Sequence, residues 1–477
     1  MITKPVKTRF APSPTGLLHL GNARMALLCA LAARHQRGIF LLRIEDTDRS
    51  RSTQQYIQAL QEDLLWLGLE WQEGPGVEGP HGPYLQSERG AVYQTYFDRL
   101  IQAGQAYPCF CSEQELALAR KVQLAAGHPP RYGGTCAKLS QQQVQERLAQ
   151  GIKPTLRFRV PAQQSVEFND LVRGAQRFNS ADIGDFIIRR ADGTPAFFFT
   201  NAIDDALMEV THVLRGEDHL TNTPRQIMLL RALGLRVPDY GHVALILGAD
   251  GAPLSKRHGS HSVRDLRDAG YFPMAVNNYL ARLGHYYDSN DLMNLDALAA
   301  QFSMEKIGRA AARFDGAQLN YWQQQAIAHA GIDELWQWVG PRVHERVPPE
   351  QSYSFIEAVR ANITMPEHAQ LWARVLFFDP LELSQGARAV IKQAGKEFFE
   401  HALRALAQHP RDFKSLAAAI KSASGVGGKA LFQPLRAALT GELDGPEMAR
   451  LLPLLGETRA HARLQQALLI SSHADIH

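Results

Sequence analysis

The chain has few cysteines, no long apolar run and little net charge. Four cysteines among 477 residues are too few for the disulfide framework of a small secreted protein, so we expect a reducing compartment. No run of 18 apolar residues occurs, and the first ten residues lack the apolar segment of a signal peptide. A formal net charge of +3 means that any nucleic acid would have to meet local basic patches. We therefore expect a soluble cytoplasmic protein with no membrane partner.

The first part of the chain alternates between amphipathic helix patterns and a buried strand pattern. Residues 22–37 have apolar side chains at helical spacing as far as Gly38, and residues 52–67 repeat that spacing. The run IFLLRI between them is typical of a buried strand. This order predicts an α/β fold with a parallel, doubly wound sheet, which binds ligands at the carboxyl ends of its strands. Arg9 and Glu45 fall at such ends.

The pattern changes twice further along the chain. Cysteines, Gly and Pro turns and short strands appear after residue 106, and we expect Asp192-Gly193 to turn one strand back onto a second, AFFF. The alternation resumes with the strand MEVTHVL, a helix capped by Thr223 and the strand HVALIL, and from about residue 320 only helical runs remain. The predicted parts are a Rossmann-like domain (1–106 and 196–240), an inserted α/β module (107–195), a connecting region (241–322) and an all-α domain (323–477).

Two short segments carry the chemistry of a nucleotide site. In the first (9–24), His19 can donate to a phosphate oxygen at the start of a helix, and Gly21 leaves room for a flat base. In the second (249–260), Lys256 and Arg257 follow a glycine-rich turn and can stabilise charge that develops on a phosphate. Each segment alone is a weak signal, because H-x-G-N turns and basic loops are common without a ligand.

In this order, however, the two segments resemble the signatures of the class I aminoacyl-tRNA synthetases. HLGN stands at the place of their HIGH motif, and PLSKR at the place of KMSKS. Over the whole chain the resemblance is to the bacterial glutamyl-tRNA synthetase family, through the ordered segments RFAPSPTG, LRIEDTD, VTHVLRGEDHLTNTPRQ, SKRHG and LFQPLRAALTG. The helical C-terminal third fits that family. It argues against bacterial glutaminyl enzymes, which end in β-barrels, and against short glutamyl-queuosine enzymes, which lack this part.

The resemblance implies a glutamate–tRNA ligase with a Rossmann-like catalytic domain of the HUP type. L-glutamate would react with ATP, in the presence of Mg²⁺, to form glutamyl-adenylate, and the glutamyl group would pass to the 3′-terminal adenosine of tRNA-Glu. The inserted module would hold the acceptor end, the connecting region would contact the stem, and the all-α domain would bind the anticodon. Basic residues expected to contact the RNA include Arg157, Arg159, Arg173, Arg189, Lys414, Lys421, Lys429 and Arg436.

The family's site residues carry over onto matching positions of this sequence. The catalytic pair would be His19 and Lys256. The glutamate site would comprise Arg9, Ala11, Ser13, Glu45, Phe197, Asn201 and Arg215. The ATP site would comprise His19, Gly21, Asn22, Asp218, Leu245, Ile246, Lys256 and Arg257. The chemistry agrees, because a guanidinium such as that of Arg9 can bind the substrate side-chain carboxylate, Glu45 can take its α-ammonium group, and Arg215 can anchor the other end.

Three positions depart from the family pattern. Phe197 replaces a tyrosine, which removes one hydrogen bond of about 1 kcal/mol. Pro253 replaces the first lysine of the second signature. Lys138 replaces the histidine that would join Cys109, Cys111 and Cys136 around zinc, and lysine is a poor zinc ligand. We therefore expect no metal there, although His128 or Tyr132 would offer an alternative fourth ligand to a degenerate zinc site.

Several alternatives stay open at this stage. The enzyme either charges tRNA-Glu alone or is a paralogue that also, or only, charges tRNA-Gln. An inactive RNA-binding paralogue would have no need of His19, Gly21, Glu45, Arg215 and Lys256, and a small-molecule nucleotidyltransferase would not explain the helical third. The family resemblance implies a monomer.

Overall fold

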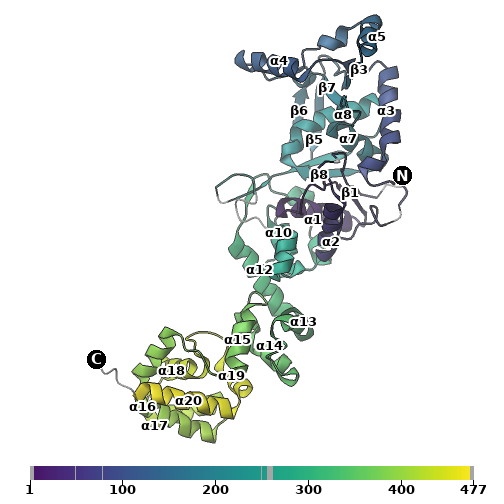
Figure 1. The fold of residues 1–477 in the computed structure, drawn as a ribbon. Coiled ribbons are helices and arrows are strands. Elements are labelled where there is room, and N and C mark those ends of the chain that lie inside the picture. The colour runs from purple at the N-terminus through teal and green to yellow at the C-terminus, as the bar shows by residue number, and fades with distance from the viewer. Residues whose placement is uncertain (1–4, 49, 78, 249, 255–261, 473–477) are drawn as a thin grey trace. The chain divides into compact units, whose positions relative to one another are not determined.

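The computed structural model describes residues 5–48, 50–77, 79–248, 250–254 and 262–472 (Figure 1). The chain divides into two compact units. The first holds the described residues as far as Asp268 together with Val276–Gly316, and the second holds Ala269–Ala275 and the described residues from Ala317 onward.

A parallel four-stranded sheet forms the centre of the first unit, in the order β2-β1-β8-β9. The strands are β1 (Lys7–Phe10), β2 (Ile39–Leu42), β8 (His212–Gly216) and β9 (Asp239–Val243). Helix α1 (Leu20–His35) packs against β1, β2 and β8 (Figure 1). The predicted parallel α/β fold is therefore confirmed.

The helices beside this sheet carry several site residues. They are α2 (Gln54–Trp66), η1 (Gln86–Glu88), α3 (Gly90–Gln102), α7 (Phe197–Leu207), η3 (Glu217–Asn222) and α8 (Thr223–Ala232).

The prediction that AFFF forms a strand is wrong. After one bridge between Arg189 and Pro195 the chain enters α7, because Pro195 has no N–H for a further ladder bond and Phe199 packs into the core.

Two smaller predictions also need correction. Thr223 does not cap α8, because its own backbone is already helical and Asn222 occupies the cap position. The Thr223 hydroxyl instead contacts Arg215 and His242. The run HVALIL does not form one strand, because β9 ends at Val243 and the short β10 (Ile246–Leu247) pairs outside the central sheet with β11 (Ala312–Arg313).

The segment between α3 and α7 contains a three-stranded antiparallel sheet and a hairpin. The sheet has the order β3-β4-β7, from β3 (Ala106–Cys109), β4 (Thr155–Phe158) and β7 (Phe186–Arg189). The hairpin joins β5 (Ser165–Asp170) to β6 (Gly174–Asn179) and reaches the central sheet where the Leu171 N–H donates to the Tyr240 carbonyl. The remaining elements are α4 (Glu113–Ala125), η2 (Thr135–Lys138), α5 (Gln141–Ala149) and α6 (Ser180–Ile183).

Two arginines expected to face RNA have internal partners instead. Arg157 is buried, lies over the ring of Tyr132 and donates to the Asp185 carbonyl. Arg173 pairs with Glu217 and donates to the His242 carbonyl. Arg157 lies in β4 and Arg173 in the turn between β5 and β6, and neither position revealed these partners, because the partners lie far away in the sequence.

Short helices follow β10, and the described residues from Gly316 onward form helices joined by loops. The former are α9 (Val263–Ala269), α10 (Pro273–Arg282), α11 (Leu295–Ala300) and η5 (Met304–Lys306). The latter are α12 (Gly316–His329), α13 (Ile332–Val343), η6 (Pro349–Gln351), α14 (Ser352–Val359), η7 (Arg360–Asn362), α15 (His368–Phe377), α16 (Gln385–Gln408), α17 (Phe413–Ser424), α18 (Lys429–Thr440), α19 (Met448–Leu455) and α20 (Glu457–Ser472).

The predicted all-α C-terminal region is thus confirmed. Helix α16 is interrupted at Gly395, which has a φ of 79°. Among the described residues, no helix is long and apolar enough to cross a membrane.

Candidate functional site

A cavity of about 540 Å³ lies where the N-terminus of α1 meets the carboxyl ends of β8 and β9. His19 caps α1 in an extended conformation, and its side chain makes no hydrogen bond to the helix it precedes. The free N–H groups of the first helical turn and the helix dipole both favour an anion at this end. Residues predicted to bind ATP line the cavity, namely His19, Gly21, Asn22, Asp218, Leu245 and Ile246.

The other predicted ATP residues, Lys256 and Arg257, lie outside the described residues. Pro253, the departure from the second signature, also lines the cavity and forms an antiparallel bridge with Leu247. At Gly21 an added Cβ would meet no heavy atom within 4 Å. The glycine therefore does not serve internal packing, and its small size matters only for what enters the cavity.

A buried cluster of charges lies at the carboxyl ends of β1 and β2. Asp205 of α7 accepts hydrogen bonds on one oxygen from Arg43 at 2.7 Å and from Arg9 at 3.1 Å. Burial opposes the charge of Asp205, but the guanidinium groups of Arg43 and Arg9 hold its pKa below the usual range. Arg9 also donates to the Leu214 carbonyl, so two of its donors are already occupied.

A second carboxylate, Glu45, continues this cluster. Its Oε1 accepts from Arg43 at 3.0 Å and from the Asn201 amide at 2.7 Å. Burial raises the pKa of Glu45, so a nearby positive ligand would favour its ionised form. The Asn201 carbonyl oxygen accepts from Gln226, and Gln226 in turn accepts from Arg215. The predicted residues Glu45, Asn201 and Arg215 are therefore joined in one hydrogen-bonded chain.

Arg215 differs from Arg9 and Arg43 in having only neutral hydrogen-bond partners. Its Nε lies 3.1 Å from Nε2 of His242, and its Nη2 donates to Thr223 and Gln226. Its Nη1 is buried and has no hydrogen-bond partner among the described residues. Burial lowers the pKa of Arg215 to about 10, so the group stays a cation at neutral pH. Such a cation is set up to receive an anionic ligand.

The remaining predicted glutamate residues lie around this chain. Ala11 and Ser13 follow β1, and Ser13 is exposed. Phe197 begins α7, and its ring centroid lies 5.4 Å from that of His219, which lines the cavity. Phe197 therefore keeps the aromatic surface of this position without a hydroxyl.

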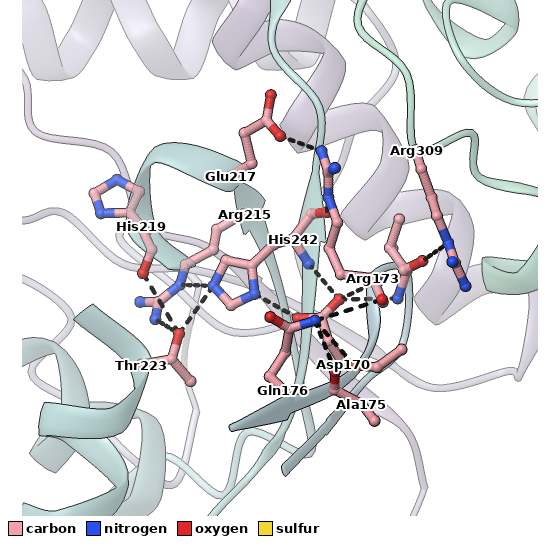
Figure 2. A network of polar contacts seen from close by, with 12 residues as sticks. Asp170, Arg173, Ala175, Gln176, Arg215, Glu217, His219, Thr223, His242 and Arg309 are labelled. Atoms are coloured by element: carbon pink, nitrogen blue, oxygen red, sulfur yellow. Dashed lines mark hydrogen bonds and ion pairs between the residues drawn. The ribbon is translucent and has the colours of Figure 1, made fainter. Parts of the chain in front are cut away.

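Sequence reasoning missed the buried polar residues that hold Arg215, which are His242, Thr223 and Gln226, and it missed Asp170 behind His242. Figure 2 shows Arg215, His242 and Asp170 joined by hydrogen bonds, with Thr223 beside them. His242 stands at the start of an apolar run, and Asp170 belongs to the inserted segment. The only local signal was a polar residue, His242, beside an apolar run, and such a signal does not say which residue is its hydrogen-bond partner.

Three thiols of the inserted segment come together. The sulfur atoms of Cys109, Cys111 and Cys136 lie within 4.8 Å of one another, and those of Cys111 and Cys136 are 3.6 Å apart. The Tyr132 hydroxyl lies 3.4 Å from Cys109 and 3.5 Å from Cys111. Of the two alternative fourth ligands considered from the sequence, the tyrosine is thus the one that contacts the thiols.

Comparison with known families matches almost the whole chain. Residues 5–321 match the family described as tRNA synthetases class I (E and Q), catalytic domain. Residues 333–468 match the family described as anticodon binding domain.

Curated relatives and solved structures agree with these matches. Glutamate–tRNA ligase 2 of Nitrosococcus oceani is 61% identical over 96% of this chain and 98% of its own length. Glutamate–tRNA ligase 1 of Methylococcus capsulatus is 54% identical over 97% of this chain and 98% of its own length. The crystal structure of a glutamate tRNA ligase from Elizabethkingia meningosepticum, in complex with its amino acid, superposes with a TM-score of 0.89 at 28% identity, covering 98% of this chain and 99% of the other.

The open space at Gly21 predicts that a larger side chain there lowers nucleotide affinity without lowering the stability of the protein. We expect Gly21→Leu to weaken binding of a non-hydrolysable ATP analogue at least about tenfold, because the side chain enters the cavity. The same change should not lower stability, because glycine in a helix costs roughly 0.5–1 kcal/mol relative to residues such as alanine. Titration calorimetry and thermal melting measure the two effects. Gly133→Leu, also in open space and not among the residues that line the cavity, is the control, and unchanged nucleotide affinity in the Gly21 variant would contradict the prediction.

Proposed function

The chain belongs to the class I tRNA synthetases for glutamate and glutamine, and from that membership we infer how its site works. It is a glutamate–tRNA ligase, which joins L-glutamate to tRNA with ATP as the second substrate. The observation that carries the proposed mechanism is the arrangement around β8. Gly216, at the end of β8, lines a cavity large enough for a nucleotide. The preceding residue in the chain is Arg215, a cation whose hydrogen-bond partners are all neutral and whose Nη1 has no partner among the described residues.

We propose that the cavity holds ATP with its phosphates toward His19 and the N-terminus of α1. The α-carboxylate of glutamate attacks the α-phosphorus, and the bond from the α-phosphorus to the α,β-bridging oxygen breaks. Pyrophosphate departs, and glutamyl-adenylate remains in the site. A hydroxyl of the terminal tRNA adenosine then attacks the acyl carbon, and AMP leaves. The protein acts by positioning and by stabilising phosphate charge. Asp218 has a partly exposed carboxylate in the cavity lining and suits the Mg²⁺ that accompanies ATP.

Arg215 is the proposed anchor of the substrate side-chain carboxylate. From the sequence, Arg9 was the expected clamp. Arg9 already pairs with Asp205, whereas Nη1 of Arg215 is a buried donor that has no hydrogen-bond partner among the described residues. A carboxylate gains more from this donor than the neutral amide of glutamine does, which favours glutamate. Glu45 is the proposed partner of the α-ammonium group. Burial raises the pKa of Glu45, and a cation bound beside it would stabilise the ionised carboxylate.

The RNA-binding assignments stay proposals that rest on the family. The inserted module (107–195) would receive the acceptor end, the region 241–322 the stem, and the helical region (323–477) the anticodon. The match of residues 333–468 to an anticodon binding domain supports the last of these. A monomer is the expected state, and tRNA-Glu is the expected acceptor, with tRNA-Gln as the alternative.

Aminoacylation with both acceptors tests the function. We expect purified protein with ATP, Mg²⁺ and radiolabelled glutamate to charge tRNA-Glu, and glutamine to give no product with either tRNA. Charging of tRNA-Gln as well, or instead, would show a relaxed or altered anticodon preference. If neither tRNA were charged, the assignment would be overturned, and the alternative of an inactive RNA-binding paralogue would take its place.

We predict that Lys256→Ala lowers turnover about 100-fold or more and leaves the KM for glutamate little changed. The reason is that this cation of the second signature stabilises charge that develops in the transition state. Steady-state aminoacylation measures both quantities. Lys396→Ala, an exposed lysine of α16, is the matched control, and near-normal turnover in the Lys256 variant would contradict the assigned role.

The positions of the three thiols in the structure suit a zinc ion better than their sequence pattern suggested. Zn–S bonds of about 2.3 Å place sulfur ligands of a tetrahedral ion roughly 3.8 Å apart, close to the 3.6 Å between Cys111 and Cys136. The Tyr132 oxygen completes the set. We therefore propose that these four residues hold a structural zinc, contrary to the absence expected from the sequence. Such an ion would stabilise the inserted module.

We predict about one zinc per chain in protein purified without chelators, measured by elemental analysis. Cys111→Ser should lose this zinc and melt at a lower temperature. Cys29→Ser should keep it, because Cys29 is buried in α1 away from the cluster. Zinc-free wild-type protein that melts at the same temperature after zinc is added would favour the metal-free cluster.

A further inference from the structure

His242 and Asp170 form a buried pair behind Arg215 to which the proposed reaction assigns no role. Both side chains are fully buried, and the His242 Nδ1 lies 2.5 Å from one carboxylate oxygen of Asp170. The other oxygen accepts three backbone N–H groups, from Val172, Arg173 and His242 itself. Figure 2 shows this arrangement at the end of the β5–β6 hairpin.

These contacts determine which ring nitrogen of His242 carries the proton. Burial opposes ionisation of Asp170, but the hydrogen bonds from His242 and the backbone hold its pKa below the usual range. An ionised carboxylate only accepts, so Nδ1 must donate. Burial lowers the pKa of His242, and Arg215 lowers it further, so the ring stays neutral. Its Nε2 then carries a lone pair that faces the Nε–H of Arg215 at 3.1 Å.

The pair orients Arg215 without neutralising it. Asp205 binds Arg9 and Arg43 directly, and each of those arginines shares its charge with that carboxylate. Asp170 acts on Arg215 only through the neutral ring. The guanidinium therefore keeps its charge while its Nε and Nη2 are held, and Nη1 is left for a ligand.

We propose that Asp170 and His242 are positioning residues for the amino-acid substrate. Asp170 fixes the tautomer of His242, and His242 holds Arg215 in the orientation that receives the side-chain carboxylate of glutamate. This inference rests on the proposed role of Arg215.

Asp170→Asn is the sharpest test, because it keeps the shape and reverses the hydrogen bond. The asparagine oxygen can still accept the backbone N–H groups, which turns its NH₂ toward Nδ1 and puts the ring proton on Nε2, against Arg215. We expect the KM for glutamate to rise at least about tenfold, since hydrogen bonds to charged groups contribute that much, while kcat and the KM for ATP change less than about threefold.

His242→Leu should raise the KM for glutamate in the same way, and His242→Gln should recover part of the loss because its amide oxygen can accept from Arg215. Gln176→Ala is the matched control. Gln176 lies on the same hairpin, and within the described part of the chain its amide donates only to the carbonyls of Arg173, Gly174 and Ala175. Its kinetic constants should stay those of the wild type.

A nitrogen NMR measurement covers the case in which the variants do not fold. In wild-type protein labelled with ¹⁵N-histidine, we expect His242 to show a protonated Nδ1 and an unprotonated Nε2. The reverse tautomer, or a folded Asp170→Asn with an unchanged KM for glutamate, would overturn the proposal. Wild-type protein that does not charge any tRNA with glutamate would overturn the proposed function instead, so the two failures are distinct.

Discussion

The amino-acid side of the site depends on Asp205. This one carboxylate binds the guanidinium groups of two arginines, from the end of β1 and from just beyond β2, and it belongs to a helix that begins almost 190 residues later. Buried charges are tolerated only when they are paired, and removal of one partner from such a group typically costs about 3–5 kcal/mol. The pairing therefore fixes α7 against the sheet, and with it the position of Asn201.

From Asn201 the polar contacts lead to Gln226 and then to Arg215 on β8. Charge is compensated at the Asp205 end and left uncompensated at the Arg215 end. In the proposed binding mode this difference orients the amino acid, because its α-ammonium group is attracted to Glu45 and its side-chain carboxylate to Arg215. These charges therefore set the orientation of the bound amino acid before the reaction begins.

Local patterns predicted much of this structure. Helical and strand periodicity is a property of neighbouring residues, so the parallel sheet and the helical C-terminal region followed from the sequence. The first signature also predicted the cavity lining, since His19, Gly21 and Asn22 are adjacent in the chain. The AFFF segment was misassigned because a short apolar run fits a strand or a buried helix equally well, and only packing against the core decides.

The support of Arg215 could not be predicted in the same way. Asp170 and His242 are 72 positions apart, and each looks like an isolated polar residue at the end of a strand. The departure at Phe197 is easier to interpret in three dimensions, because its ring packs beside that of His219. The hydrogen bonds that join Glu45 to Arg215 pass through Asn201 and Gln226, so the missing hydroxyl removes none of them.

The hairpin that carries Asp170 has a consequence for how such an enzyme can be taken apart. By sequence the hairpin belongs to an insertion, the kind of segment that is often regarded as an accessory added to a finished core. Yet Asp170, the last residue of its first strand, β5, completes a contact inside that core. A minimal catalytic fragment made by excising the insertion would keep every signature motif and still lack the carboxylate behind His242. The hairpin and strand β9 are therefore interdependent, because removing one leaves a buried polar group of the other without its partner.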